Sequence, residues 1–94
     1  MEINYMCMGD ILQYLTKNLT ISDKGVMNGI KTVDLLNDFV NFKSNRYSKD
    51  AIWYAIVKLA ENDYILYDTS SKREIINIYD VTIKGHEYLA NYEF

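Results

Sequence analysis

The chain has 94 residues, of which 49% are hydrophobic and 24% charged, with a formal net charge of -3. This composition is that of an ordinary globular domain and excludes a disordered or fibrous chain. No apolar stretch approaches the roughly 20 residues that span a bilayer, and the N-terminus has no leader-like pattern. We therefore expect one cytoplasmic domain over residues 1–94, with no membrane contact. The single cysteine, Cys7, cannot form an internal disulfide, which favours a reducing compartment.

The first predicted element is a helix over residues 5–19. Its apolar side chains recur at steps of three and four, the period of one helix face. They are Tyr5, Met8, Leu12, Leu15 and Leu19. Over residues 20–31 this period disappears, and glycine, asparagine and aspartate accumulate. That composition predicts a loop with a short strand at residues 29–31.

Two further helices follow, each preceded by a hydroxyl side chain of the kind that caps helices. Thr32 is predicted to cap a second helix, because apolar residues follow it at helical spacing. These are Val33, Leu35, Leu36, Phe39, Val40 and Phe42. Ser48 is predicted to cap a third helix that ends near Asn62, with Asp50 in the first turn, where the helix dipole favours an acid.

The third helix has two distinct faces when its residues are placed at steps of about 100°. One face is predicted to join the core and comprises Ile52, Ala55, Ile56 and Leu59, while the other looks outward and comprises Asp50, Tyr54, Val57, Lys58 and Glu61. Residues 64–67 and 74–81 are rich in β-branched and aromatic side chains, which predicts a hairpin. Thr82 is then expected to cap a last helix from Ile83 to about Tyr92.

Three helices, a hairpin and a closing helix follow the order of a winged helix-turn-helix. This is an α+β fold with a three-helix core, a two-stranded antiparallel wing and a C-terminal helix. Two stretches carry the resemblance. "YSKDAIWYAIVKLAENDYI", residues 47–65, looks like a recognition helix that runs into the first wing strand, and "VTIKGHEYL", residues 81–89, is similar to the Leu-Thr-x-x-Gly pattern that ends many wings.

More specifically, the chain resembles a family of small phage and prophage proteins of unknown function with this fold. It departs from the family pattern at Ala55, Lys58 and Asp63, where we expect histidine, leucine and glycine. The resemblance implies a protein that is not an enzyme and has no cofactor.

Basic residues gather at the two places where a winged helix meets DNA. "TSSKRE", residues 69–74, brings Lys72 and Arg73 to the predicted wing tip, and a second cluster lies around the start of the third helix. We therefore predict a DNA-binding transcriptional regulator whose partner is double-stranded DNA. The predicted contact residues are Lys43, Arg46, Tyr47, Ser48, Lys49, Tyr54, Val57, Lys58, Lys72 and Arg73. Tyr47 and Ser48 are expected to bind phosphate or sugar oxygens through their hydroxyls.

An alternative hypothesis is a protein-interaction module that does not bind DNA. The outward face of the third helix has no Arg, Asn or Gln, the side chains that make bidentate base contacts, and it includes two acids. Small basic clusters are also more often plain solvated surface than binding sites. In this reading Trp53, Tyr54 and Val57 form an apolar patch that meets a protein partner.

The terminal helices carry many aromatic and sulfur side chains, among them Tyr5, Met8, Tyr88, Tyr92 and Phe94. A homodimer through these helices would cover them, and the alternative is that they pack on one another within one chain.

His86, the only histidine, has no partners at metal-ligand spacing. We expect its side chain to dock the last helix on the wing, and Gly85 to permit close packing there.

Overall fold

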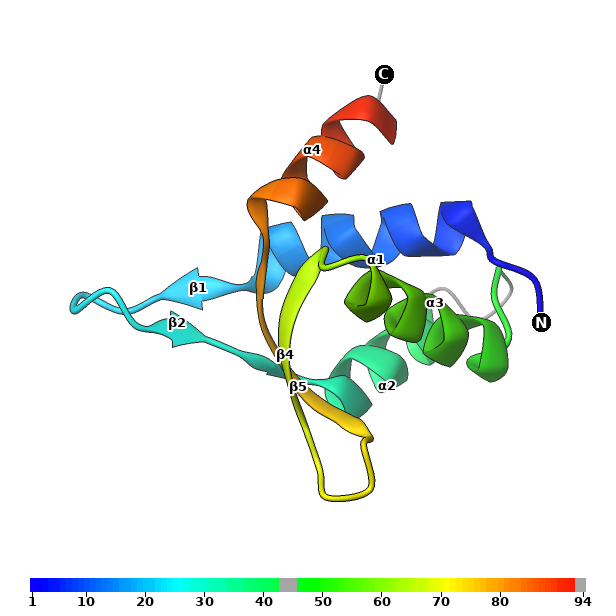
Figure 1. Ribbon diagram of the computed structural model, residues 1–94, viewed down its shortest axis with the longest axis horizontal. Helices are drawn as coiled ribbons and strands as arrows, with labels where there is room; N and C mark the ends of the chain where they lie inside the picture. The colour runs from blue at the N-terminus through cyan, green and yellow to red at the C-terminus, as the bar shows by residue number, and fades with distance from the viewer. Residues whose placement is uncertain (43–45, 93–94) are drawn as a thin grey trace.

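The computed structural model describes residues 1–42 and 46–92. The helices are α1 (Tyr5–Asn18), α2 (Thr32–Phe42), α3 (Lys49–Glu61) and α4 (Ile83–Tyr92). The strands are β1 (Thr20–Ile21), β2 (Met27–Asn28), β3 (Ile30–Lys31), β4 (Ile65–Thr69) and β5 (Ile75–Val81). β4 and β5 form the wing, which hangs from one side of the helices, while α4 lies on the other side of α1 (Figure 1).

The wing belongs to an antiparallel sheet of order β3-β5-β4. β3 pairs with β5 at Ile30 and Ile78, and β4 pairs with β5 at Ile65 and Val81. Ile65, Ile78 and Val81 point to the helices and are buried. The sheet therefore fixes the wing to the helical core at its base and leaves its far end free.

The core forms where α1, α2, α3 and the base of the sheet meet. All four residues of the predicted inner face of α3 are buried, which confirms that prediction. Ile11, Leu12 and Leu15 of α1 pack into the same cluster with no exposed surface. Because full burial of one such side chain contributes about 1.5–3 kcal/mol, these faces hold the helices together.

The predicted caps of α3 and α4 are confirmed, and the predicted cap of α2 is wrong. Ser48 Oγ accepts a hydrogen bond from the Ala51 amide at 3.1 Å, and Thr82 Oγ1 accepts one from the Gly85 amide at 3.0 Å. Thr32, in contrast, is already the first residue of α2. Its hydroxyl is buried and has no hydrogen-bond partner in the part of the chain that the structure describes. The reason is that β3 runs directly into α2, so Lys31 occupies the position before the helix.

Two further predictions for residues 20–42 need correction. The segment expected to be a loop with one short strand contains the β1–β2 hairpin as well as β3, and this hairpin projects away from the body (Figure 1). Its turn uses Gly25 at φ 80°, a left-handed conformation that favours glycine. The apolar stripe of α2 is also narrower than predicted, because Leu35, Leu36 and Phe39 are buried whereas Val33 and Val40 are exposed.

The junction between α3, the wing and α4 is tightly packed. A Cβ atom at Gly85 would overlap the carbonyl oxygen of Tyr64, which confirms that this glycine permits close packing. Asp63 adopts φ 59°, the backbone conformation for which the family pattern has glycine. His86 does not dock α4 as expected, because its side chain is exposed.

The aromatic side chains of α4 pack largely within the chain. The Tyr88 ring stacks on Tyr64 with centroids 4.9 Å apart, and it lies 6.2 Å from the Tyr92 ring. Met8 of α1 is buried as well. Over residues 1–42 and 46–92, no helix has the length and apolar character needed to cross a bilayer.

Candidate nucleic-acid interface

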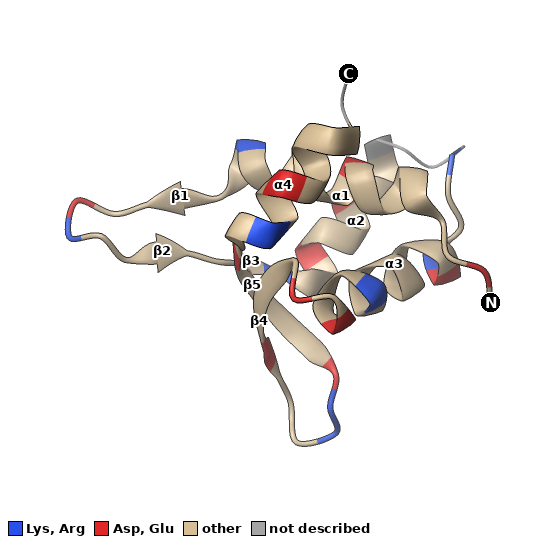
Figure 2. Cartoon of the chain, turned by 45° about the horizontal axis from the view of Figure 1, so that its top comes forward, with Lys and Arg blue, Asp and Glu red and all other residues tan. Residues whose placement is uncertain are grey.

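The wing tip is a tight turn that carries two exposed basic side chains. The Ser70 amide donates to the Glu74 carbonyl at 2.8 Å, and the Arg73 amide donates to the Ser70 carbonyl at 2.9 Å. Ser70 Oγ also accepts from the amides of Lys72 and Glu74, both at 3.2 Å. The turn therefore presents the exposed Lys72 and Arg73 next to each other at the end of the wing (Figure 2).

The start of α3 supplies a second group of polar and basic residues. Lys49 is the first residue of α3 and is exposed. Ser48 Oγ already accepts the Ala51 amide, but its own proton is not used by that bond and remains able to donate to an oxygen. Lys43, also predicted to contact DNA, lies outside the described residues.

Arg46 and Tyr47 are held by an acid of α1. Arg46 Nη1 lies 3.2 Å from Asp10 Oδ2, and the Tyr47 hydroxyl donates to the same oxygen at 2.5 Å. Burial and this hydrogen bond raise the pKa of Tyr47, so its hydroxyl stays protonated. Tyr47 is only 7% exposed, which contradicts the expectation that its hydroxyl meets a phosphate. Arg46 keeps about half of its side chain in solvent and therefore remains accessible.

Asp10 also affects the pKa of the single cysteine, Cys7. Burial, together with the negative charge of Asp10, raises the pKa of the Cys7 thiol to about 12. The thiol is therefore protonated near neutral pH and is a poor nucleophile. Within the described ranges, no three His, Cys, Asp or Glu side chains converge as a metal-binding set.

The outward face of α3 carries matched charges. Lys58 Nζ lies 2.8 Å from Glu61 Oε2 and 5.0 Å from the centre of the Tyr54 ring. Basic and acidic residues alternate along the helix in sequence, in the order Lys49, Asp50, Lys58 and Glu61 (Figure 2). This face is therefore not uniformly positive, and Lys58 would have to leave Glu61 to contact DNA.

Two acids of α2, Asp34 and Asp38, act on Tyr14 of α1. Asp38 accepts a hydrogen bond from the Tyr14 hydroxyl, where α1 and α2 meet. Burial and this bond raise the pKa of Tyr14 to about 12, and the charge of Asp34 acts on the same group. DNA binding requires the acids near the interface to lie off its basic side chains. Asp38 is held by Tyr14 and Asp34 acts on the same group, whereas Asp50 and Glu61 lie on α3 itself.

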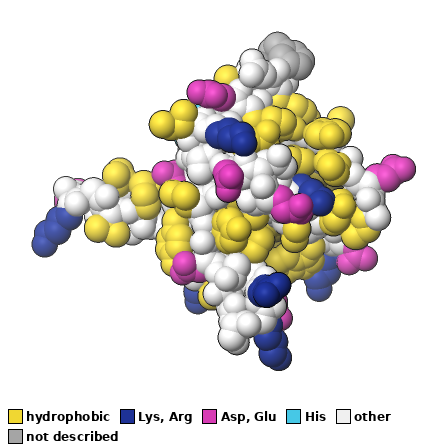
Figure 3. Space-filling view, in the orientation of Figure 1, with side chains coloured by type: hydrophobic (Ala, Val, Ile, Leu, Met, Phe, Trp, Pro, Cys, Tyr) yellow, Lys and Arg dark blue, Asp and Glu magenta, His cyan; other side chains and the backbone are white. Residues whose placement is uncertain are grey.

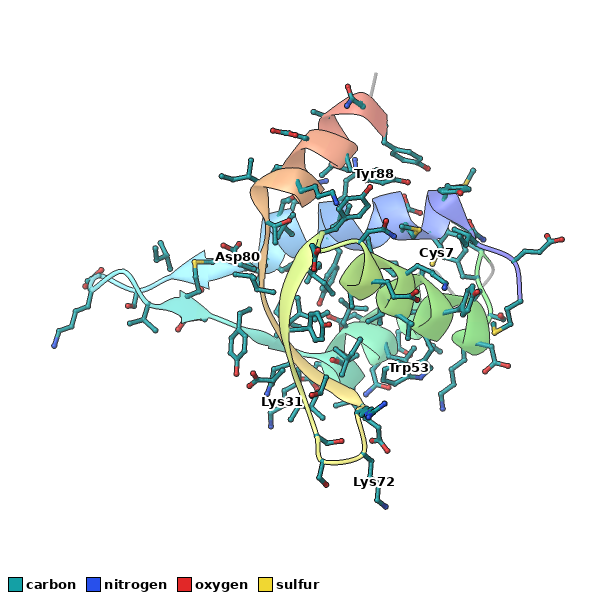
Figure 4. The ribbon with its side chains drawn as sticks, in the orientation of Figure 1. Cys7, Lys31, Trp53, Lys72, Asp80 and Tyr88 are labelled. Carbon is teal, nitrogen blue, oxygen red and sulfur yellow. The ribbon has the colours of Figure 1, made fainter. Side chains whose placement is uncertain are left out.

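A groove of about 1000 Å³ lies between α3, the first residues of α2 and the wing, and we call it the α3–wing groove. Trp53 and Val57 line it from α3, and Tyr67 and Ile75 line it from the wing. Apolar surface is visible between α3 and the wing in Figure 3, and Figure 4 shows Trp53 beside the wing and Lys72 at its end. Tyr54 does not line the groove, so the predicted patch of Trp53, Tyr54 and Val57 is divided.

The groove also brings in a basic residue that the sequence analysis did not identify. Lys31 lies at the end of β3, where it pairs with Asn77 of β5, and it lines the groove together with Arg73. Its position depends on the pairing of strands 46 residues apart in the sequence, from Lys31 to Asn77. No local pattern around Lys31 indicates this placement.

Comparison with known proteins supports the fold. No protein-family model matches the chain, and neither does any curated protein. A PadR-like transcriptional regulator from Bacillus cereus has a similar structure, with a TM-score of 0.62, 16% identity, and coverage of 95% of this chain and 79% of that one. A protein from Thermoplasma acidophilum described as a candidate transcriptional regulator has a TM-score of 0.63 at 14% identity, covering 95% and 78%. These two structural similarities do not test the resemblance to small phage and prophage proteins. The architecture is the predicted winged helix-turn-helix.

Proposed function

We propose that this chain is a small, non-enzymatic regulator that binds double-stranded DNA. The observation that carries the proposal is the wing-tip turn, which carries the exposed Lys72 and Arg73 at the place where a winged helix meets the DNA backbone. Lys49 at the exposed start of α3 supplies a second anchor. The two similar structures from Bacillus cereus and Thermoplasma acidophilum are described as transcriptional regulators, which favours the same role here.

Phosphate contacts would dominate this interaction. Lys72 and Arg73 would bind the backbone from the wing, while Lys49, the Ser48 hydroxyl and the first amides of α3 would bind it from the helix. The face of α3 that would meet base edges carries Tyr54, Val57 and the paired Lys58. Because these side chains offer few bidentate base contacts, we expect modest sequence discrimination and a strong dependence on salt.

The proposal is tested by the fluorescence anisotropy of a labelled mixed-sequence duplex, titrated with the protein at several salt concentrations. The double variant Lys72→Ala/Arg73→Ala should weaken binding to all sequences alike. If each side chain neutralises one phosphate, the slope of log K against log salt should become shallower by about 1.8. Lys17→Ala/Lys24→Ala removes the same charge from exposed positions outside the wing and α3, and should have little effect. Equal losses in the two double variants would count against the wing.

The second candidate is a protein-interaction module, and the apolar lining of the α3–wing groove favours it. Trp53 and Val57 present apolar surface there that a partner would cover. If no duplex binds even at low salt, this candidate replaces the first. The exposed Val57 is then the residue to change, because Val57→Asp should prevent capture of a partner without disturbing the core.

We also propose a homodimer formed through α1 and α4. Tyr5, Met6 and Ile83 are 59%, 54% and 79% exposed, so apolar surface remains on these helices after their internal packing. Sedimentation equilibrium tests this, and Ile83→Asp should shift the chain toward monomer. A cytoplasmic location and a phage or prophage origin stay predictions from the sequence.

A further inference from the structure

The α3–wing groove has the size and lining of a small-molecule site. Its volume of about 1000 Å³ lies at the upper end of the range of ligand pockets, roughly 300–1000 Å³. Trp53 and Val57 form one wall, and Tyr67 and Ile75 form the opposite wall. Such sites combine apolar walls with a few polar groups that orient the ligand.

The charged residues of the groove favour an anion. Lys31, Glu61, Arg73 and Glu74 all line it. The charge of Glu61 is matched by Lys58 at 2.8 Å. Neither Lys31 nor Arg73 has a carboxylate within ion-pair distance in residues 1–42 and 46–92. Among the described residues, Lys31, Arg73 and Glu74 thus have no ion-pair partner. The four charged lining residues alone sum to zero, and the local charge becomes positive by one because Lys58, just outside the lining, neutralises Glu61.

A polar atom without a partner lies in the same wall. Thr32 lines the groove, is 1% exposed, and has a hydroxyl that makes no hydrogen bond to any described residue. A buried hydroxyl in this state is uncommon, because it has lost its water without gaining another partner.

We propose that the α3–wing groove binds an amphipathic anion, with an apolar body between Trp53 and the wing and one carboxylate held by Lys31 and Arg73. Val57 and Arg73 belong both to this groove and to the proposed DNA interface. The ligand therefore competes with DNA, and this competition, unlike the binding itself, rests on the proposed function.

The binding is tested without DNA. Trp53 is the only tryptophan in the chain, so its fluorescence reports on the groove alone. Decanoate is titrated below its micelle concentration and compared with decanol and decyltrimethylammonium, which have the same chain and a neutral or cationic head. Decanoate should give a saturable change at the lowest concentration. No response of Trp53, or equal binding of all three probes, would overturn the proposal.

Two substitutions locate the carboxylate. Lys31→Ala should weaken decanoate about two- to fivefold, the range of a partly exposed ion pair, and leave decanol unchanged. Lys24→Ala removes the same charge at the tip of the β1–β2 hairpin and should change neither. Loss of decanoate binding in Lys24→Ala to the same degree as in Lys31→Ala would mean that the probe responds only to net charge, which contradicts the site.

The competition is measured by adding decanoate to the protein and the labelled duplex at fixed salt. The apparent dissociation constant of the duplex should rise in inverse proportion to the fraction of grooves that Trp53 reports as unoccupied. Decanoate that binds without releasing the duplex would refute the competition. If the duplex never binds, the proposed function fails, while the Trp53 titration still decides the site.

Discussion

Thr32 and Thr82 provide a matched pair of substitutions with opposite expected signs. The Thr32 hydroxyl is buried without a hydrogen-bond partner among the described residues, and such a group costs about 1–3 kcal/mol. Thr32→Val keeps the shape and removes the hydroxyl. We therefore expect the free energy of unfolding to rise by about 1 kcal/mol, which raises Tm by about 4–8 °C in a domain of this size.

The same substitution at Thr82 should destabilise the protein. The Thr82 hydroxyl donates to the Asp63 carbonyl at 2.6 Å and accepts the Gly85 amide at 3.0 Å. Loss of a helix cap costs about 0.5–2 kcal/mol, and the Asp63 carbonyl also loses its donor. Thr82→Val should thus lower Tm while Thr32→Val raises it.

Urea denaturation followed by circular dichroism measures both changes on one scale, with an unchanged m-value showing that the unfolded state is not altered. Equal losses of stability in both variants would refute the reasoning, because they would mean that the Thr32 hydroxyl does have a partner.

Three further changes test other features. Helix propensity favours alanine over glycine by about 1 kcal/mol, yet Gly85→Ala should destabilise or unfold the domain, because its Cβ overlaps the Tyr64 carbonyl oxygen; thermal denaturation checks the sign. Asp63→Gly should stabilise by about 0.5–1 kcal/mol by relieving φ 59°, and a neutral or negative effect would contradict the strain. Burial and Asp38 raise the pKa of Tyr14 from 10.0 to about 12, so its contribution to stability is complete below pH 10 and is lost as pH rises toward 12. Tyr14→Phe should therefore make the fall of Tm over this interval shallower, and parallel pH profiles would argue against it.

Elements with local signals were predictable from the sequence. The start of α3 is an example, because the Ser48 cap, the acid at Asp50 and the inner face lie within a few residues of one another. The wing was predictable for the same reason, since two β-branched runs flank one polar turn.

The contacts that hold the candidate interface in place were not predictable in this way. Asp10 reaches Arg46 and Tyr47 across 36 and 37 residues, and only the packing of α1 against the start of α3 brings them together. Tyr47 looked available to DNA because its burial depends on that packing. Lys31 was overlooked for a similar reason, since its role follows from its pairing with β5.

The β1–β2 hairpin and the start of α2 were predicted incorrectly for a different reason. β1 and β2 have two residues each and are largely exposed, so they lack the alternation that marks a strand. The signal that was present is Gly25 in a polar turn between Ile21 and Val26. At Thr32 the sequence pattern of a helix cap was present. The burial of its hydroxyl depends on tertiary packing, which the neighbouring residues in the sequence do not indicate.

The construction of the wing tip has a consequence for how its reach can vary. The hydrogen bonds of the turn run between Ser70, Lys72, Arg73 and Glu74, and among residues 1–42 and 46–92 none connects it to the helices. The turn can therefore be moved outward as a unit when both strands are lengthened together. Because strand side chains alternate between faces, two residues added to each strand keep Tyr67 and Ile75 on the inner face, whereas a single residue would reverse them. Related chains of different wing length should accordingly differ by even numbers of residues in each strand, except where the change falls at one of the two register shifts of the hairpin, which already accommodate a single extra residue.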